Sequence, residues 1–174
     1  MDADKLVLVG RSLAGYLAPR AAAFEHRIAA LVCDPPDPNL GSHIPGGLVG
    51  LMAAPIISVE EKLSADKREF FRARMATHGV RTIEDYFATL RDYDMLSVAS
   101  QITAPTLLVE CENDPLAGSD GAKALASRMT APTSHIALTV ASGASGHCGG
   151  LGQNVWDSAV YNWVDATLGR PEQA

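Results

Sequence analysis

Ser12 is the residue whose surroundings most clearly suggest chemistry. It lies in the segment Gly10-Arg-Ser-Leu-Ala-Gly15, directly after the apolar run Leu6-Val-Leu-Val9. Small residues two positions away on either side, between a strand-like and a helix-like segment, are typical of a nucleophile elbow, a tight turn that lifts a strained serine out of the backbone. Ala14 stands where the commonest form of the motif has glycine. The pattern therefore predicts a nucleophilic Ser12, although Gly-x-Ser-x-Ala also arises by chance and then marks only a turn.

A serine hydroxyl is inert at neutral pH unless a base removes its proton, and that base must itself be oriented. Among five histidines, His147 lies in a glycine-rich loop, Ser142-Gly-Ala-Ser-Gly-His147-Cys-Gly-Gly150, just beyond the last strand-like run. A side chain there can reach over the carboxyl edge of a sheet, so His147 is the predicted base. We interpret the others as surface or packing residues: His26, His43, His78 and His135.

Two aspartates follow strand-like runs and could orient the imidazole. Asp114 ends the segment Leu107-Leu-Val-Glu-Cys-Glu-Asn-Asp114, and Asp34 directly follows the run that ends at Cys33. We favour Asp114 as the acid. Asp34 remains the alternative acid, because some serine hydrolases take this residue from the earlier strand, and its competing interpretation is a loop-capping role.

The elements that must position these residues follow an α/β pattern. Short aliphatic and β-branched runs alternate with helical segments, which is typical of a parallel sheet with right-handed crossovers. We therefore predict an α/β fold with a parallel sheet of about four strands and flanking helices. The expected strands are residues 5–9, 28–33, 106–111 and 135–141, and the expected helices are 13–24, 117–129 and 153–168.

A long insertion separates the second and third expected strands. It opens with a segment rich in proline and glycine, and helix signals follow: a capping box at Ser58 and Glu61, a helix stop at Gly79, and a second start at Thr82 with Asp85. A structureless loop of this length is uncommon in a compact domain. We predict a helical cap at residues 35–102, inserted into a core formed by residues 1–34 and 103–174.

Composition excludes several classes of function. The chain has 174 residues, which suits one domain with a sizeable core, and its net charge of -6 without a cluster of basic residues argues against nucleic acid or an anionic membrane as partner. The longest apolar stretch, residues 48–57, is too short to cross a bilayer and contains a proline, and the N-terminus lacks a signal-like pattern. We expect a soluble, cytoplasmic protein that binds a small-molecule substrate.

The three cysteines suggest neither disulfides nor a metal site. Cys33, Cys111 and Cys148 are odd in number and lack metal-finger spacing. A site combining His147 with cysteines has no ligand pair at suitable spacing in the sequence. We expect reduced thiols, no metal and no cofactor.

Three motifs together carry a resemblance. The segments 10–20, 102–114 and 146–152 contain the elbow, the expected acid and the expected base in the order Ser, Asp, His, which is the order of the α/β-hydrolases. The chain resembles the C-terminal half of an α/β-hydrolase, from the elbow onward. Within that superfamily it is similar to the FrsA-like and dihydroxypseudooxynicotine-hydrolase branch, whose members hydrolyse esters or carbon-carbon bonds in ketone substrates and carry a helical cap.

The resemblance implies a serine hydrolase in which Ser12, Asp114 and His147 form the triad and the Leu13 amide contributes to the oxyanion hole. It also implies a second oxyanion donor from a loop in the N-terminal half, and such a donor is typically worth about 10²- to 10³-fold in turnover. We therefore expect an enzyme acting on a carboxylic ester or a carbon-carbon bond next to a carbonyl, weakened by truncation. The alternative is a catalytically silent fragment or an association module.

The first expected strand, residues 5–9, leads to a further prediction. In the family this strand lies between two neighbours, and its unbroken apolar run suits burial on both faces. Without one neighbour it becomes a sheet edge, which presents unpaired backbone groups to other chains. We expect self-association through residues 5–9, or a requirement for a partner that supplies the other half of the fold.

Overall fold

The computed structural model describes residues 5–44, 64–117 and 120–169. The chain divides into two compact units: Met1–Pro38 with Met95–Ala174, and Asn39–Asp94. This division lies inside the predicted insertion 35–102, and the role of the inserted unit as a cap remains a prediction.

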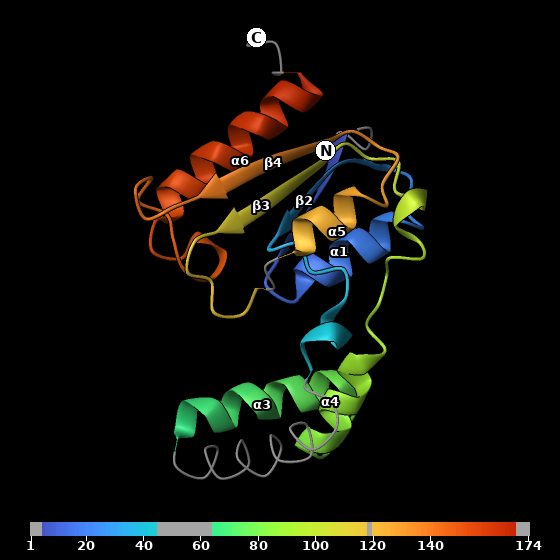
Figure 1. The fold of residues 1–174 in the computed structure, drawn as a ribbon, viewed down its shortest axis with the longest axis vertical. Coiled ribbons are helices and arrows are strands. Elements are labelled where there is room, and N and C mark those ends of the chain that lie inside the picture. Colours follow the sequence, from blue (N-terminus) through green and yellow to red (C-terminus); the bar gives the residue numbers. More distant parts are fainter. Residues whose placement is uncertain (1–4, 45–63, 118–119, 170–174) are drawn as a thin grey trace. The chain divides into compact units, whose positions relative to one another are not determined.

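A parallel sheet forms the core of the first unit, as the sequence predicted. Its four strands lie in the order β1-β2-β3-β4, and every neighbouring pair is parallel (Figure 1). Their carboxyl ends therefore meet at one edge of the sheet. The strands are β1 Leu6–Arg11, β2 Ile28–Asp34, β3 Thr106–Cys111 and β4 Thr133–Leu138.

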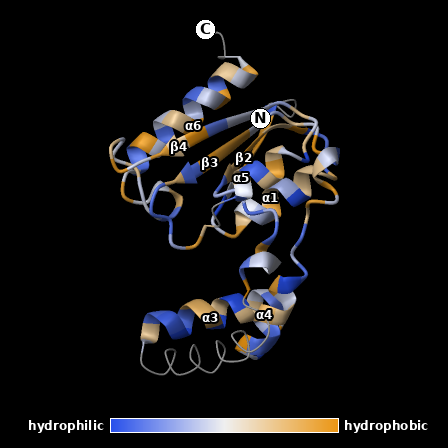
Figure 2. Ribbon diagram, in the orientation of Figure 1, coloured by the Kyte–Doolittle hydropathy of each residue, from blue (hydrophilic) through white to orange (hydrophobic). Residues whose placement is uncertain are grey.

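Helices cover both faces of this sheet. The helix α6, Gln153–Leu168, lies on one face, whereas α1, Ala14–Ala22, and α5, Gly121–Ala126, lie on the other (Figure 1). One side of α6 packs into the core: Trp156 and Val160 are buried against β2, β3 and β4, and Trp163 packs beside them. Figure 2 shows apolar residues concentrated in the strands of the sheet.

Several predicted boundaries differ from the structure. By one or two residues at an end, β1, β2 and α1 depart from the expected ranges 5–9, 28–33 and 13–24. The last strand, expected at 135–141, ends at Leu138, because Thr139 and Ser142 form reciprocal hydrogen bonds between backbone N–H groups and hydroxyl oxygens, which turn the chain. The helix expected at 117–129 is shorter, and α5 spans only Gly121–Ala126. Hydrogen bonds of Thr139 and Ser142, rather than apolar periodicity, therefore set the end of β4.

Strand β1 is an edge of the described sheet, since it pairs only with β2 there. Leu6 and Val9 are 44% and 38% exposed, whereas every residue of β3 except Glu110 is buried. The apolar run of β1 is thus partly uncovered. Self-association through this strand remains a prediction.

The second unit contains the helices α3, Ala65–His78, and α4, Ile83–Arg91. Gly79 ends α3 in the left-handed conformation (φ 69°), and the Thr82 hydroxyl caps α4 by accepting the Asp85 N–H, so both predicted signals are confirmed. The predicted capping box at Ser58 and Glu61 lies outside the described residues. In the described parts of the chain no helix is long and apolar enough to cross a bilayer.

Candidate active site

Ser12 occupies the turn between β1 and α1 with a positive φ of 57°. Residues other than glycine rarely adopt this backbone conformation, and such strain often accompanies functional sites. The turn is held by the backbone, because the Ser12 N–H donates to the Asp34 carbonyl (2.7 Å) and the Ser12 carbonyl accepts the Gly15 N–H (2.8 Å).

The glycines of the motif are required by close approach of the backbone. A Cβ at Gly10 would lie 2.1 Å from the Ala14 carbonyl oxygen and 2.6 Å from the Ala18 Cβ, and one at Gly15 would lie 1.8 Å from the Pro35 carbonyl oxygen. Larger residues would push β1, α1 and the loop after β2 apart. Steric contact with the neighbouring backbone therefore explains why Gly10 and Gly15 are glycines.

His147 reaches Ser12 from the loop after β4. The short 3-10 turn η4, His147–Gly149, follows Gly146, whose N–H donates to the Glu112 carbonyl at the end of β3 (2.8 Å). The imidazole Nε2 lies 2.8 Å from the Ser12 hydroxyl oxygen, and Nδ1 lies 2.9 and 3.0 Å from the two carboxylate oxygens of Asp114.

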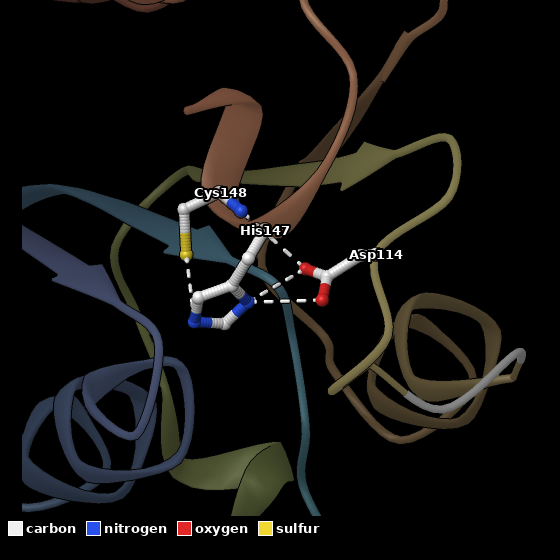
Figure 3. A group of neighbouring side chains, drawn as sticks. All are labelled: Asp114, His147 and Cys148. Carbon is white, nitrogen blue, oxygen red and sulfur yellow. Dashed lines mark hydrogen bonds and ion pairs between the residues drawn. The ribbon is translucent and has the colours of Figure 1, made fainter. Parts of the chain in front are cut away.

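The Asp114 side chain is 1% exposed and is oriented by the backbone. One of its oxygens accepts the Leu116 N–H (2.9 Å), and the other accepts the Cys148 N–H (3.4 Å). Figure 3 shows the carboxylate facing the imidazole. We assign the proton to Nδ1 on this network, which leaves Nε2 as an acceptor for the serine hydroxyl. A hydroxyl so placed can lose its proton as it attacks an electrophile.

Asp34, the alternative acid, contacts other groups. Its fully buried carboxylate accepts the Trp156 Nε1–H (2.5 Å) and lies 3.6 Å from the Cys111 sulfur and 3.9 Å from Arg11 Nε. Burial raises the pKa of Asp34, while the indole N–H and the guanidinium act in the opposite direction. The geometry places Asp114, rather than Asp34, beside the imidazole.

The Leu13 amide stands at the start of α1, directly after Ser12. Its N–H donates to no acceptor among the described residues. An N–H in this position can bind a negatively charged oxygen that forms next to the serine.

The sequence did not predict that two further residues, Cys148 and Arg11, lie at this site. The Cys148 sulfur accepts the Ser12 N–H (3.2 Å), donates to the Asp34 carbonyl (3.3 Å) and lies 3.7 Å from His147 Nε2. Burial, and then the charge of Asp34, raise the pKa of this thiol to about 11. Arg11 donates to the Cys148 carbonyl (2.5 Å). The only sequence signal for either residue is its position directly beside Ser12 or His147.

A metal could find ligands in the same place. One ligand atom from each of Asp114, His147 and Cys148 lies within 4.8 Å of the others. Both Asp114 oxygens already bond to His147 Nδ1, and the Cys148 thiol would have to lose its proton before binding a metal. The absence of a metal cofactor therefore remains a prediction.

Comparisons with known proteins place the fold. No family model and no curated protein matches the sequence. Among solved structures the chain is similar to 2,6-dihydroxy-pseudo-oxynicotine hydrolase (TM-score 0.67, 18% identity) over 100% of this chain and 43% of that one. It is also similar to the α/β hydrolase GrgF from Penicillium sp. sh18 (0.59, 18%; 97% and 64%) and to acetyl xylan esterase from Paenibacillus sp. R4 (0.58, 22%; 95% and 46%).

The chain thus spans less than two thirds of the length of each of these three structures. The chain has the α/β-hydrolase fold, of which it carries a four-stranded portion.

Proposed function

We propose that this protein is a serine hydrolase that cleaves a carboxylic ester, or a carbon-carbon bond next to a carbonyl, in a small molecule. One observation carries the proposal: the imidazole of His147 bridges the Ser12 hydroxyl (2.8 Å) and the Asp114 carboxylate (2.9 Å). These are the contacts that a serine needs in order to act as a nucleophile at neutral pH.

The acylation step follows from these positions. Ser12 Oγ attacks the substrate carbonyl carbon while His147 Nε2 takes the hydroxyl proton, and Asp114 stabilises the imidazolium. The Leu13 N–H binds the oxyanion of the tetrahedral intermediate. When the intermediate collapses, the bond to the leaving group breaks and His147 returns the proton, to the alkoxide of an ester or to the carbanion of a cleaved ketone.

Deacylation repeats the same proton movements. A water molecule attacks the acyl-serine while His147 accepts its proton, and the released carboxylic acid leaves Ser12 protonated again. No step requires a cofactor. The similar structures include a hydrolase and an esterase by name, which supports hydrolysis, and the choice between the two bond types is the finer part of this proposal.

The test is hydrolysis of p-nitrophenyl acetate by the wild-type chain and by Ser12→Ala. We expect turnover by the wild type and loss to background in the variant. Ser158→Ala provides the matched control, because Ser158 is an exposed serine of α6 whose hydroxyl donates to the helix carbonyl of Asn154. Equal rates for wild type and Ser12→Ala would overturn the proposal and favour the alternative, a catalytically silent association module.

A further inference from the structure

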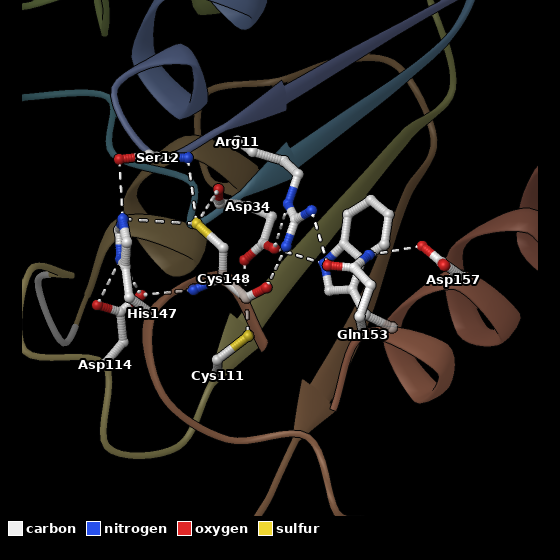
Figure 4. A network of polar contacts seen from close by, with 10 residues as sticks. Arg11, Ser12, Asp34, Cys111, Asp114, His147, Cys148, Gln153 and Asp157 are labelled. Atoms are coloured by element: carbon white, nitrogen blue, oxygen red, sulfur yellow. Dashed lines mark hydrogen bonds and ion pairs between the residues drawn. The ribbon is translucent and has the colours of Figure 1, made fainter. Parts of the chain in front are cut away.

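We propose that Arg11 is a positioning residue, which fastens the loop carrying His147 to the strand end that carries Ser12. This inference rests on the proposed function and deepens it. Arg11 is the last residue of β1 and directly precedes the serine. Figure 4 shows its guanidinium extending from β1 toward the segment that follows His147.

The guanidinium makes two hydrogen bonds to that segment. One terminal nitrogen donates to the Cys148 carbonyl (2.5 Å), and the other donates to the Gln153 side-chain oxygen at the start of α6 (3.1 Å). More than 130 residues separate each partner from Arg11. One side chain therefore joins the first and last parts of the core unit at the candidate site.

Other groups hold the guanidinium in this orientation. Its central carbon lies 4.3 Å from the centroid of the Trp156 ring, a distance typical of a cation-π contact. Its Nε, which is buried and has no hydrogen-bond partner among the described residues, lies 3.9 Å from the Asp34 carboxylate. Asp34 in turn accepts the Trp156 indole N–H. A planar, permanently charged group satisfies these contacts together, whereas a lysine could satisfy only some of them.

The loop needs such support because of its backbone. Cys148 has a positive φ of 52°, and a residue other than glycine stays in this strained region only where its surroundings enforce it. His147 directly precedes this strained residue. A displacement of about 1 Å in a catalytic group can cost about 10²-fold in rate, so loosening the Cys148 carbonyl would separate the imidazole from Ser12.

The experiment compares Arg11→Met with wild type in two assays. Methionine keeps an apolar stem against Trp156 but has no N–H donors. We expect kcat for p-nitrophenyl acetate to fall about 10- to 100-fold with KM unchanged. The second-order rate of labelling by a fluorophosphonate should fall by a similar factor, because it depends on serine activation. Arg20→Met is the matched control, since Arg20 lies on α1 with its guanidinium near Phe24, and it should keep wild-type rates.

Two further measurements separate positioning from a general loss of stability. Because the Arg11 side chain is 36% exposed, the space left by Arg11→Ala opens to solvent, and methylguanidinium at concentrations that do not denature the protein should restore part of kcat. Arg11→Lys should retain more activity than Arg11→Met.

Three results would overturn the inference: an unchanged labelling rate in Arg11→Met, a loss that only follows the unfolded fraction seen by circular dichroism, or no rescue by methylguanidinium. In each, an active wild type leaves the proposed function standing. An inactive wild type would overturn both.

Discussion

The imidazole Nε2 of His147 lies 2.8 Å from the hydroxyl oxygen of Ser12, although 135 residues separate the two in the sequence. Parallel strands bring them together, since β1 ends one residue before the serine and the loop after β4 turns back over the same sheet edge. The Gly146 N–H ties that loop to the end of β3. The sheet thereby sets the position of His147 relative to Ser12.

Replacing His147, the proposed base, should remove most of the activity. A positioned general base contributes about 10²- to 10⁴-fold, so His147→Ala should lower kcat for p-nitrophenyl acetate by that factor. His135→Ala is the control, because its imidazole lies on β4 and bonds to Glu110 instead. Equal losses in the two variants would show that His147 has no special role.

The two aspartates should rank in a definite order. Asp114→Asn should lower kcat by up to about 10⁴-fold, because an amide cannot hold the imidazole tautomer or stabilise its charge. Asp34→Asn should cost less, since the Asp34 carboxylate contacts Trp156, Cys111 and Arg11 rather than the imidazole. Steady-state kinetics of both variants decide this, and the reverse ranking would move the acid to the end of β2.

Asp34 should also make stability depend on pH. Its pKa is raised in the folded state, mainly by burial, so the unfolded chain loses this proton first as pH rises above the ordinary value of 3.8. The Asp34 contribution to the free energy of unfolding is therefore largest in acid and falls as pH rises from that value to the folded-state pKa. Urea unfolding of wild type and Asp34→Asn across this range should show the decline removed in the variant; parallel curves would contradict it.

The thiols should react slowly in the folded protein. Burial raises the pKa of Cys148 to about 11 and of Cys111 to about 12, and the thiolate is the reactive form. Iodoacetamide at pH 8 should label them far more slowly in native protein than in urea, as mass spectrometry of the alkylated peptides can follow. Rapid native labelling of Cys148 would mean that its thiol is not buried between Ser12 and Asp34.

Two substitutions in the elbow, Gly10→Ala and Ala14→Gly, should differ in their effect on the free energy of unfolding. Gly10→Ala should destabilise the fold by about 1 to 3 kcal/mol, the usual range for overpacking, because the new Cβ would meet the Ala14 carbonyl at 2.1 Å. Ala14→Gly should cost no more than about 1 kcal/mol. Chemical unfolding of both variants measures the difference, and a stable Gly10→Ala protein would contradict the steric account of this turn.

Local sequence patterns predicted much of the fold. Aliphatic periodicity and turn residues gave the bounds of β3 and α6 as observed, and the parallel sheet followed from their alternation. The Arg11 network could not be predicted, because it depends on the register of β1 beside β2 and on side-chain directions from α6. The same holds for the Cys148 sulfur between Ser12 and Asp34. Sequence patterns singled out the triad candidates, but only the fold determines their separation.

Labelling with a fluorophosphonate probe, followed by peptide mapping, tests the central claim most directly, since the probe reacts with an activated serine whatever the natural substrate. The account predicts a single labelled residue, Ser12, with labelling abolished in Ser12→Ala and slowed at least about 10²-fold in His147→Ala. Absence of labelling in the folded wild type, or labelling of another serine, would contradict it.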